Sequence, residues 1–231
     1  MRITFIGTGA GSSIGTKRVK SSILVNESIL FDLGPGADLK LEDLKIYDKP
    51  KALFITHLHV DHFNGLFDYL VQRKIRGIKD LEIYSPQGIE KILESYVTVG
   101  NKISTKIYES QLPRGKIDDL EVYSVKACHS IYAVSYVVRD KSRKVIYTGD
   151  TLEPCDNILE EAKDSDLIIH ETTCVNDCSA WGHTSINQII NLFDRKRKVI
   201  ITHIPIHEEE EIKKLGEGKV IIAFDGLSID V

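Results

Sequence analysis

The stretch Thr56–His62, THLHVDH, places three of the chain's eight histidines within six positions, with Asp61 directly before the last of them. His57 and His59 are two residues apart, so in extended backbone they project to one side and can bind one cation. Asp61 and His62 enter an expected helix and can turn toward a second cation. The spacing therefore predicts the start of a two-metal site, which needs further ligands from elsewhere in the chain.

Short runs rich in Ile, Val, Tyr and Phe predict β-strands, and several of them lead into a residue that carries chemistry. These residues are Asp32 after ILF, His57 after ALFIT, Asp150 after VIYTG, Glu171 after LIIH and His203 after VIIT. Catalytic groups collect where strands continue into loops at one edge of a sheet. His129 in KACHS, Asp150 and His203 are therefore candidates to complete the ligand sets, although His129 or His203 taken alone could equally be a structural histidine.

The strand candidates alternate with amphipathic helical stretches from end to end. We expect one domain over residues 1–231, because no linker rich in Pro, Gly or Ser interrupts the pattern. One helix is predicted over residues 61–74, where apolar residues recur at helical spacing. General layer rules favour helices packed outside sheets, which gives an α/β fold.

The formal net charge of −4 argues against a broad surface for nucleic acid. Basic clusters at residues 73–79, 141–144 and 195–198 leave room for a small one, although we interpret all three as solvated surface. No apolar run approaches the roughly 20 residues that a membrane span needs. The N-terminal segment has too short an apolar core for a signal peptide. We expect a cytoplasmic protein without a membrane partner.

The four cysteines, Cys128, Cys155, Cys174 and Cys178, are too few and too scattered to predict a disulfide framework. Two cysteines alone do not make a zinc site. We therefore expect reduced thiols, with Cys174 and Cys178 as the pair that could be bridged or bind a metal.

Further motifs flank the histidine stretch in a fixed order: ILFDLGPG before it, then TGDT, HETT, GHTS and ITHI after it. This series resembles the metallo-β-lactamase superfamily, and within it the ribonuclease Z-like phosphodiesterases. The resemblance runs from GTGAGSS near the start to AFDGLSIDV at the end. It implies a four-layer αββα sandwich with a dinuclear site at one edge of the two sheets. The implied cofactor is two Zn²⁺ per chain, with Mn²⁺ or Fe²⁺ also possible because His and Asp ligands accept them.

The resemblance also implies a role for each ligand candidate. His57, His59 and His129 would hold the first zinc ion, and Asp61, His62 and His203 the second. Asp150 would bridge both ions, and Asp32 would support the site by hydrogen bonding from behind the ligands.

Two neighbouring cations lower the pKa of a shared water and clamp the oxygens around the attacked centre. The expected nucleophile is a hydroxide bound to both metals, with Asp61 as a ligand and as the base that orients the water or accepts its proton. The resemblance places Glu171 and His183 together near the departing oxygen, where a carboxylate raises the pKa of imidazole and makes it a proton donor. Alternatively, His183 could cap the helix that begins after Thr184.

One departure from the resemblance concerns the substrate. Ribonuclease Z proper carries a long basic arm, which holds transfer RNA, between the positions that match His129 and Asp150. Here only the 20 residues 130–149 separate them, and they predict a β-hairpin with its turn near residues 140–142. The short chain is closer to arm-less phosphodiesterases that act on cyclic nucleotides or other small phosphodiesters.

We therefore expect a metal-dependent phosphodiesterase that acts on a small or cyclic phosphodiester or on an RNA 3′ end. Three alternatives stay open: a thioester or lactone hydrolase of the same superfamily, a true transfer-RNA 3′ endonuclease despite the missing arm, and a non-catalytic metal-stabilised binding protein. A homodimer is expected from the resemblance. We expect His170 to pack inside the protein and His207 to lie at the surface.

Overall fold

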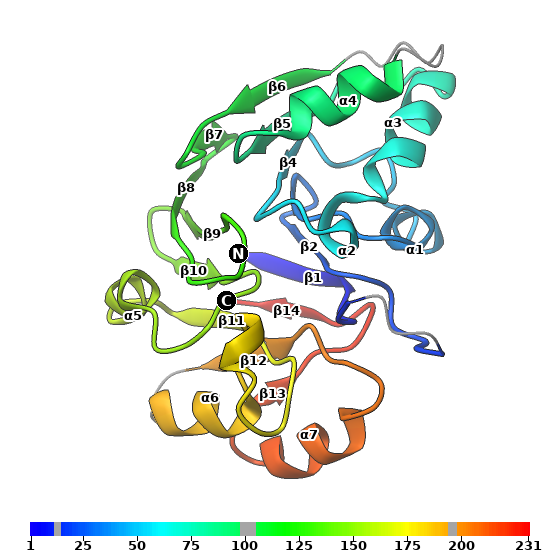
Figure 1. Cartoon of the computed structure of the whole chain (residues 1–231). Coiled ribbons are helices and arrows are strands. Elements are labelled where there is room, and N and C mark those ends of the chain that lie inside the picture. Colours follow the sequence, from blue (N-terminus) through cyan, green and yellow to red (C-terminus); the bar gives the residue numbers. More distant parts are fainter. Residues whose placement is uncertain (12–14, 98–104, 194–197) are drawn as a thin grey trace.

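Two β-sheets lie face to face and helices cover their outer faces (Figure 1). The computed structural model describes residues 1–11, 15–97, 105–193 and 198–231. The layer order is helices, sheet, sheet, helices, so the predicted four-layer αββα sandwich is confirmed. The assignment of residues 1–231 to one domain stays a prediction.

The first sheet has the strand order β14-β1-β2-β3-β4-β5-β6. Its strands are β1 (Arg2–Gly7), β2 (Ser22–Val25), β3 (Ile29–Phe31), β4 (Ala52–Phe54), β5 (Glu82–Ser85), β6 (Lys106–Glu109) and β14 (Ser228–Asp230). Strands β3 to β6 pair in parallel, and the remaining neighbours are antiparallel. The parallel strands β3 and β4 therefore end at the same edge of the sheet.

The second sheet has the order β13-β12-β11-β10-β9-β8-β7. Its strands are β7 (Gly115–Ile117), β8 (Leu120–Lys126), β9 (Val134–Arg139), β10 (Lys144–Tyr147), β11 (Leu167–Glu171), β12 (Val199–Thr202) and β13 (Ile221–Ile222). Strands β10 to β13 are parallel. Strands β9 and β10 form the predicted hairpin, and Oδ1 of Asp140 closes its turn by accepting the N–H groups of Ser142 and Arg143 at 2.7 and 2.9 Å.

The helices divide between the two outer faces. The helices α1 (Ala37–Asp43), α2 (Val60–Phe63), α3 (Leu66–Ile75) and α4 (Ile89–Val97) lie on the first sheet, and α5 (Asp156–Ala162), α6 (Ile186–Leu192) and α7 (Glu209–Gly216) on the second. A single 3₁₀ turn, η1, covers Ser179–Trp181. None of the helices in the described ranges is long and apolar enough to cross a membrane.

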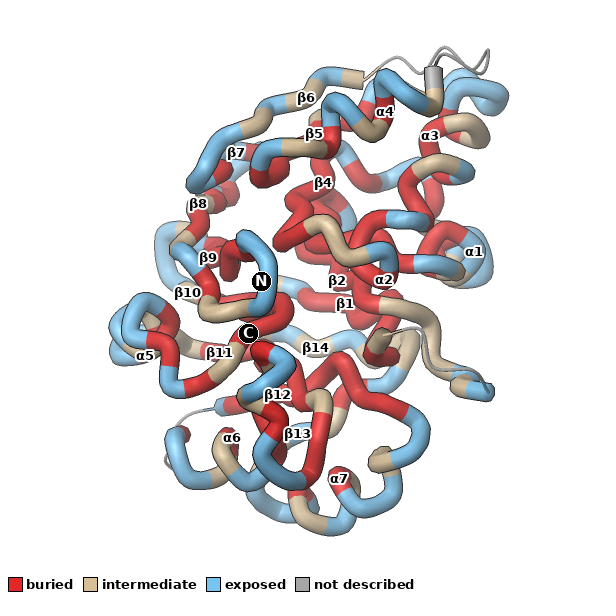
Figure 2. The backbone as a smooth tube through the Cα atoms, in the orientation of Figure 1, coloured by how far each residue is buried: buried red, intermediate tan, exposed pale blue. Residues whose placement is uncertain are grey.

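Strand side chains alternate between a central core and an outer core. Phe31 and Phe54 point between the sheets, whereas Leu30 and Leu53 pack under the helices of the first sheet. Both faces of the central strands are buried, as Figure 2 shows in red. This is why the strands are short continuous apolar runs rather than alternating ones.

The helix predicted over residues 61–74 is interrupted, so the prediction of one continuous helix is wrong. The chain leaves α2 after Phe63, and α3 begins at Leu66. At the break, the N–H of Gly65 donates to the carbonyl of Leu33 at 3.0 Å. The backbone of Gly34 lies directly against Gly65, where a side chain would not fit. Because of the break, α2 can orient Asp61 and His62 independently of α3, which packs on the first sheet.

The expectation of reduced cysteines is wrong as well. The structure pairs Cys128 with Cys155 and Cys174 with Cys178, at Cα–Cα distances of 5.8 and 6.4 Å. Cys128 follows β8 and Cys155 precedes α5, so the fold brings together two positions that are 27 residues apart in the sequence. Sequence spacing alone does not reveal such a long-range contact.

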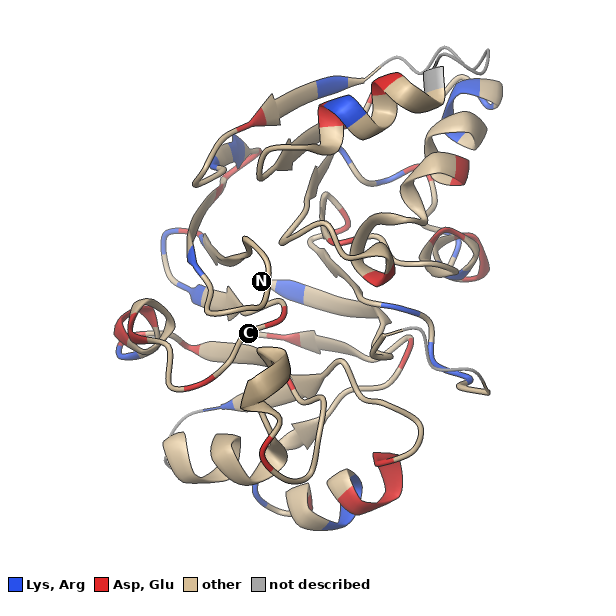
Figure 3. Cartoon of the chain, in the orientation of Figure 1, with Lys and Arg blue, Asp and Glu red and all other residues tan. Residues whose placement is uncertain are grey.

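The basic clusters behave as structured or solvated surface. Arg73 is buried and donates to the hydroxyl of Tyr69 at 3.0 Å, and Arg76 pairs with Glu42 at 2.6 Å. In the second cluster, Arg143 pairs with Asp166 at 2.9 Å. Figure 3 shows basic and acidic residues interspersed over both halves of the chain. The interpretation as solvated surface therefore holds for residues 141–144, whereas for the first cluster it is wrong at the buried Arg73. Residues 195–197 of the third cluster lie outside the described residues.

The contact at Gly65 gives a stability prediction. In Gly65→Ala the new Cβ would lie 2.5 Å from the carbonyl oxygen of Gly34. We expect the free energy of unfolding, measured by urea denaturation, to fall by about 1–3 kcal/mol. Asn64→Ala is the control, because the exposed neighbour should change it by less than about 0.5 kcal/mol. Equal stability of the two variants would contradict the close contact.

Candidate metal centre

The seven predicted ligands come together where the loops after β4, β8, β10 and β12 meet. They form two groups, and within each group the ligand atoms lie within 4.8 Å of one another. The first group is His57, His59, His129 and Asp150, and the second is Asp61, His62 and His203. A third combination contains Asp150, His183 and His203.

In the first group, ring nitrogens face one another. Nε2 of His57 lies 3.0 Å from Nδ1 of His59, and Nε2 of His129 lies 3.2 Å from the same Nδ1. Oδ2 of Asp150 lies 3.6 Å from Nε2 of His57. These atoms surround a point from which three imidazoles and a carboxylate could hold a cation.

The second group is built in the same way. Nε2 of His203 lies 3.2 Å from Oδ2 of Asp61 and 3.3 Å from Nε2 of His62. The other oxygen of Asp150, Oδ1, lies 3.2 Å from Nε2 of His62. Asp150 therefore presents one oxygen to each group.

Hydrogen bonds fix the orientation of four imidazoles. Nδ1 of His62 donates to Oδ2 of Asp32 at 2.7 Å, and Nδ1 of His129 to the carbonyl of Gly182 at 2.7 Å. The hydroxyl of Thr56 donates to Asp32, so it accepts from Nδ1 of His57 at 3.0 Å. In the same way, the hydroxyl of Thr173 donates to Glu171 and accepts from Nδ1 of His203 at 2.9 Å. With a cation bound, each ring would present the lone pair of Nε2 to it, as metal-binding histidines do.

The residues present fit divalent cations. Oδ1 of Asp150 is buried and has no hydrogen-bond partner among the described residues. A buried carboxylate oxygen without a partner is costly, and nearby cations would satisfy it. Imidazole nitrogen and carboxylate oxygen are also the ligand types that zinc and related metals take.

Asp32 supports the site from behind, as the resemblance implies. It is fully buried, and besides His62 it accepts the N–H of Thr56 and the hydroxyl of Tyr147, both at 2.8 Å. Asp32 and His203 both have a φ of 56°, a left-handed conformation that costs non-glycine residues energy and that collects at functional sites.

Glu171 and His183 form the predicted pair. Nδ1 of His183 lies 2.8 Å from Oε1 of Glu171, which is buried and also accepts the N–H of Thr151 at 3.1 Å. The cap of α6 is Ser185, whose hydroxyl accepts the N–H of Gln188. The alternative in which His183 caps this helix is therefore wrong.

The pair determines the protonation of His183. Burial alone would lower the pKa of His183, but the hydrogen bond and the charge of Glu171 outweigh burial and raise this pKa to about 9. The ring is therefore protonated at neutral pH, with Nδ1 donating to the carboxylate and Nε2 available to a substrate.

The charge states of His57 and Asp150 favour cation binding, whereas that of His62 opposes it. Burial and the neighbouring His62 hold the pKa of His57 well below its usual range. Burial would raise the pKa of Asp150, yet the charges of His203 and His62 hold it well below its usual range. Burial opposes the charge on His62, but Asp150 and Asp32 outweigh this and raise its pKa. A proton on His62 and a cation compete for the same nitrogen.

An open pocket of about 410 Å³ leads to the two groups. Its lining residues are Ala10, Gly11, His59, Asp61, Asp150, Thr173, His183, His203, Pro205 and His207. The side chain of His207 is 69% exposed and yet lines this pocket, so it is a surface residue at the mouth of the site. His170 is buried beside Glu153, as expected.

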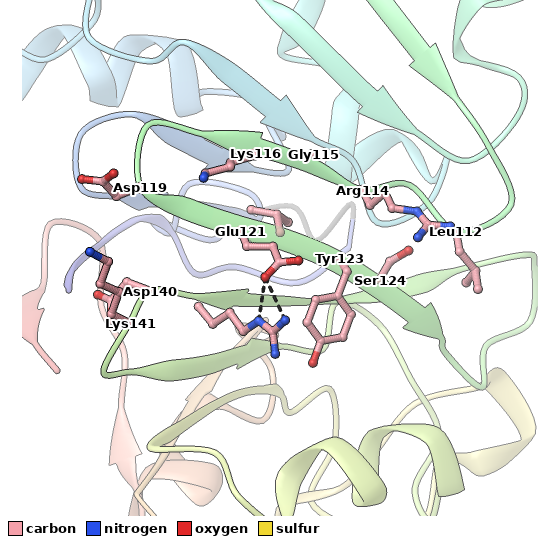
Figure 4. A pocket seen from close by; sticks show the side chains of 12 residues that line it. Leu112, Arg114, Gly115, Lys116, Asp119, Glu121, Tyr123, Ser124, Asp140 and Lys141 are labelled. Atoms are coloured by element: carbon pink, nitrogen blue, oxygen red, sulfur yellow. Dashed lines mark hydrogen bonds and ion pairs between the residues drawn. The ribbon is translucent and has the colours of Figure 1, made fainter.

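A larger cavity of about 850 Å³ lies away from this site (Figure 4). It is formed by the hairpin strands β7 to β9, where Glu121 pairs with Arg139 at 2.8 Å beside the ring of Tyr123. The ligand groups found among the described residues do not include any residue of this cavity. Size alone does not identify the functional site.

Sequence reasoning missed several partners of the ligands. Thr56 and Thr173 were within the quoted motifs THLHVDH and HETT, so a signal was present. Gly182 and Tyr147 were likewise within the quoted motifs GHTS and VIYTG, but the local sequence does not show that they contact His129 and Asp32.

Comparisons with known proteins place this geometry in a family. A family model for the beta-lactamase superfamily domain matches residues 27–207. Ribonuclease Z of Methanosarcina acetivorans is 26% identical over 302 aligned positions, which cover 100% of this chain and 98% of the relative. Ribonuclease Z of Streptococcus pneumoniae is 31% identical over 86% of this chain and 71% of the relative. The metallo-beta-lactamase fold protein YhfI from Bacillus subtilis superposes with a TM-score of 0.81 at 21% identity, covering 99% of this chain and 98% of that one.

Asp150, which presents one oxygen to each group, gives a prediction for metal binding. We expect Asp150→Ala to weaken binding of both cations by more than about 100-fold, because each loses an oxygen ligand. Zinc titration with a competing chelator measures both affinities. Asp156→Ala, an exposed aspartate at the start of α5, should bind as the wild type does. Loss of only one of the two affinities would show that Asp150 is not shared.

Asp32 gives a second prediction. Asp32→Asn keeps the shape of the side chain but removes the charge that holds Nδ1 of His62. We expect the affinity of the second group to fall by about 10- to 100-fold in the same titration. An unchanged affinity in a folded variant, checked by circular dichroism, would mean that Asp32 does not orient His62 for metal binding.

Proposed function

The chain belongs to the beta-lactamase superfamily and is a ribonuclease Z-like hydrolase of that superfamily, and from this premise we propose that it is a metal-dependent phosphodiesterase. Its proposed substrate is a small or cyclic phosphodiester or an RNA 3′ end. The observation that carries the proposal is the pair of buried Glu171 and partly exposed His183, in which His183 lies beside Asp150 and lines the same pocket.

We propose two Zn²⁺ per chain, with Mn²⁺ or Fe²⁺ as alternatives. The proposed ligands are His57, His59 and His129 for the first ion and Asp61, His62 and His203 for the second, with Asp150 shared. When bound, such cations lower the pKa of a water molecule and neutralise charge on the phosphate oxygens.

Asp61 is the proposed acceptor for the proton of the attacking water. Its carboxylate lines the pocket, and its Oδ2 lies 3.2 Å from Nε2 of His203. Burial would raise the pKa of Asp61, but the hydrogen bond from His203 and the nearby charges lower it, so the group is ionised. The ionised carboxylate can orient the water, and its lowered pKa makes it a weak acceptor that would pass the proton on rather than keep it.

His183 is the proposed donor to the leaving group. Its Nδ1 is held by Glu171, so Nε2 can deliver a proton to the departing oxygen. An alkoxide is a poor leaving group and needs this proton, whereas a thiolate does not. The pair therefore supports a phosphodiester with an alkoxide leaving group over a thioester.

We propose a small substrate because this chain is short and its β9–β10 hairpin has a turn of only a few residues. The alignment with the Methanosarcina relative needs 302 positions, whereas this chain has 231 residues, so the relative carries additional segments. Transfer-RNA 3′ processing is the second candidate, because both aligned relatives are named ribonuclease Z. The homodimer and the cytoplasmic location stay predictions.

A substrate panel on the zinc- and manganese-loaded protein tests this function. It consists of bis-p-nitrophenyl phosphate, 2′,3′-cyclic nucleotides, a thioester, a lactone and a precursor transfer RNA. We expect turnover of the small phosphodiesters. Hydrolysis of the thioester or lactone alone would overturn the proposal, and bound metal without any turnover would indicate a binding protein.

The role of His183 predicts a dependence on the leaving group. We expect His183→Ala to lower kcat by about 100- to 10,000-fold on a 2′,3′-cyclic nucleotide, which releases an alkoxide. On bis-p-nitrophenyl phosphate the loss should stay below about tenfold, because p-nitrophenolate leaves without a proton. Glu171→Gln should show the same pattern in weaker form, and Asp156→Ala should change neither rate. Equal losses on both substrates would contradict proton donation by His183.

A further inference from the structure

Several exposed apolar side chains stand close in the sequence to residues of the site. Five of them are at least 38% exposed and stand within three positions of a proposed ligand or of His183: Val60, Ile131, Tyr132, Trp181 and Ile206. These residues lie on four of the segments that carry the site, and none of them lines the pocket itself.

Trp181 stands out among these residues. It is the only tryptophan of the chain, and 71% of its surface is exposed. Tryptophan is on average a highly buried residue, so such exposure needs a reason. Trp181 lies two positions before His183, and their Cα atoms are therefore at most about 7 Å apart.

The backbone under Trp181 is tied to the site. The N–H of Trp181 donates to the carbonyl of Cys178 at 3.0 Å, and Cys178 is bridged to Cys174. The carbonyl of the next residue, Gly182, accepts from Nδ1 of His129 at 2.7 Å. Gly182 has a φ of 76°, and a Cβ on it would lie 2.7 Å from the backbone nitrogen of Ser130. The indole is thus carried by an anchored turn.

We propose that Trp181 is a stacking platform for the heterocyclic base of a nucleotide whose phosphodiester occupies the pocket. The proposal rests on the phosphodiesterase function above and names its substrate class. Every base has a π-face, so stacking on one indole tolerates all four bases and favours the larger purines. The enzyme would then select nucleotides over simple phosphodiesters without reading the base sequence.

The structure favours a base over an apolar chain as the occupant. The pocket is lined by His183, two residues after Trp181, and most of its lining residues are polar, so it could hold a phosphate, whereas an acyl chain would need a continuous apolar groove. A base needs only the face of one ring.

Intrinsic fluorescence tests the platform directly, because Trp181 is the only indole. Titration of the zinc-loaded protein with AMP should quench the emission saturably, whereas ribose 5-phosphate should leave it unchanged. A competition assay with bis-p-nitrophenyl phosphate establishes that both compounds occupy the pocket. Equal responses to the two bound compounds would overturn the proposal.

Kinetics test the same contact on a reacting substrate. Thymidine 5′-p-nitrophenyl phosphate and methyl p-nitrophenyl phosphate release the same leaving group, but only the first carries a base. We expect Trp181→Ala to lower kcat/KM by about 5- to 150-fold on the first and by less than about twofold on the second. Trp181→Phe should recover most of the loss, because it restores an aromatic face.

The control and the remaining outcomes separate this inference from the function on which it rests. Tyr108→Ala removes an aromatic side chain that is 45% exposed on β6, the outermost strand of the first sheet, and should change neither rate. Equal losses of Trp181→Ala on both substrates, or no loss on either, would overturn the platform. A wild type inactive on both substrates would overturn the phosphodiesterase function, while quenching by AMP still decides whether Trp181 binds a base.

Discussion

Asp150 is a buried carboxylate whose two oxygens face different groups of imidazoles, at 3.6 Å from Nε2 of His57 and at 3.2 Å from Nε2 of His62. Removal of a carboxylate from water costs several kcal/mol unless positive charge lies beside it. The pKa of His62 is raised, so a proton can supply this charge where a cation does not. The loops after β4 and β12, which carry His57, His62 and His203, therefore supply the positive charge that Asp150 needs.

The two sheets meet this requirement through contacts that cross between them. Phe31 of the first sheet packs against Tyr136 of the second with ring centroids 5.5 Å apart. The hydroxyl of Tyr147, on β10, reaches Asp32 at the end of β3, and Asp32 in turn holds His62. A left-handed residue such as Asp32 costs on the order of 1–3 kcal/mol, which the surrounding core must offset. The position of His62 thus depends on the contact between the two sheets, through Tyr147 and Asp32.

Local patterns in the sequence predicted the parts of the site that local structure determines. The spacing of THLHVDH and the strand ends before Asp150 and His203 place ligands through the periodicity of strand and helix, and the resemblance supplied their grouping. The break at Gly65 was not predictable, because it depends on a carbonyl of Leu33 that arrives from another loop. The bridge between Cys128 and Cys155 likewise depends on how α5 docks beside β8.

The loop between β11 and α6 couples catalysis to substrate contact. Through the carbonyl of Gly182 it orients His129, and through His183 it presents the proposed proton donor, while Trp181 projects from the same turn. Binding energy from a group remote from the reacting atoms accelerates a reaction when it positions them. A base held on Trp181 would act on the same rigid turn that aligns His129 and His183. Substrate selection and the geometry of the reacting groups are then consequences of one anchored segment.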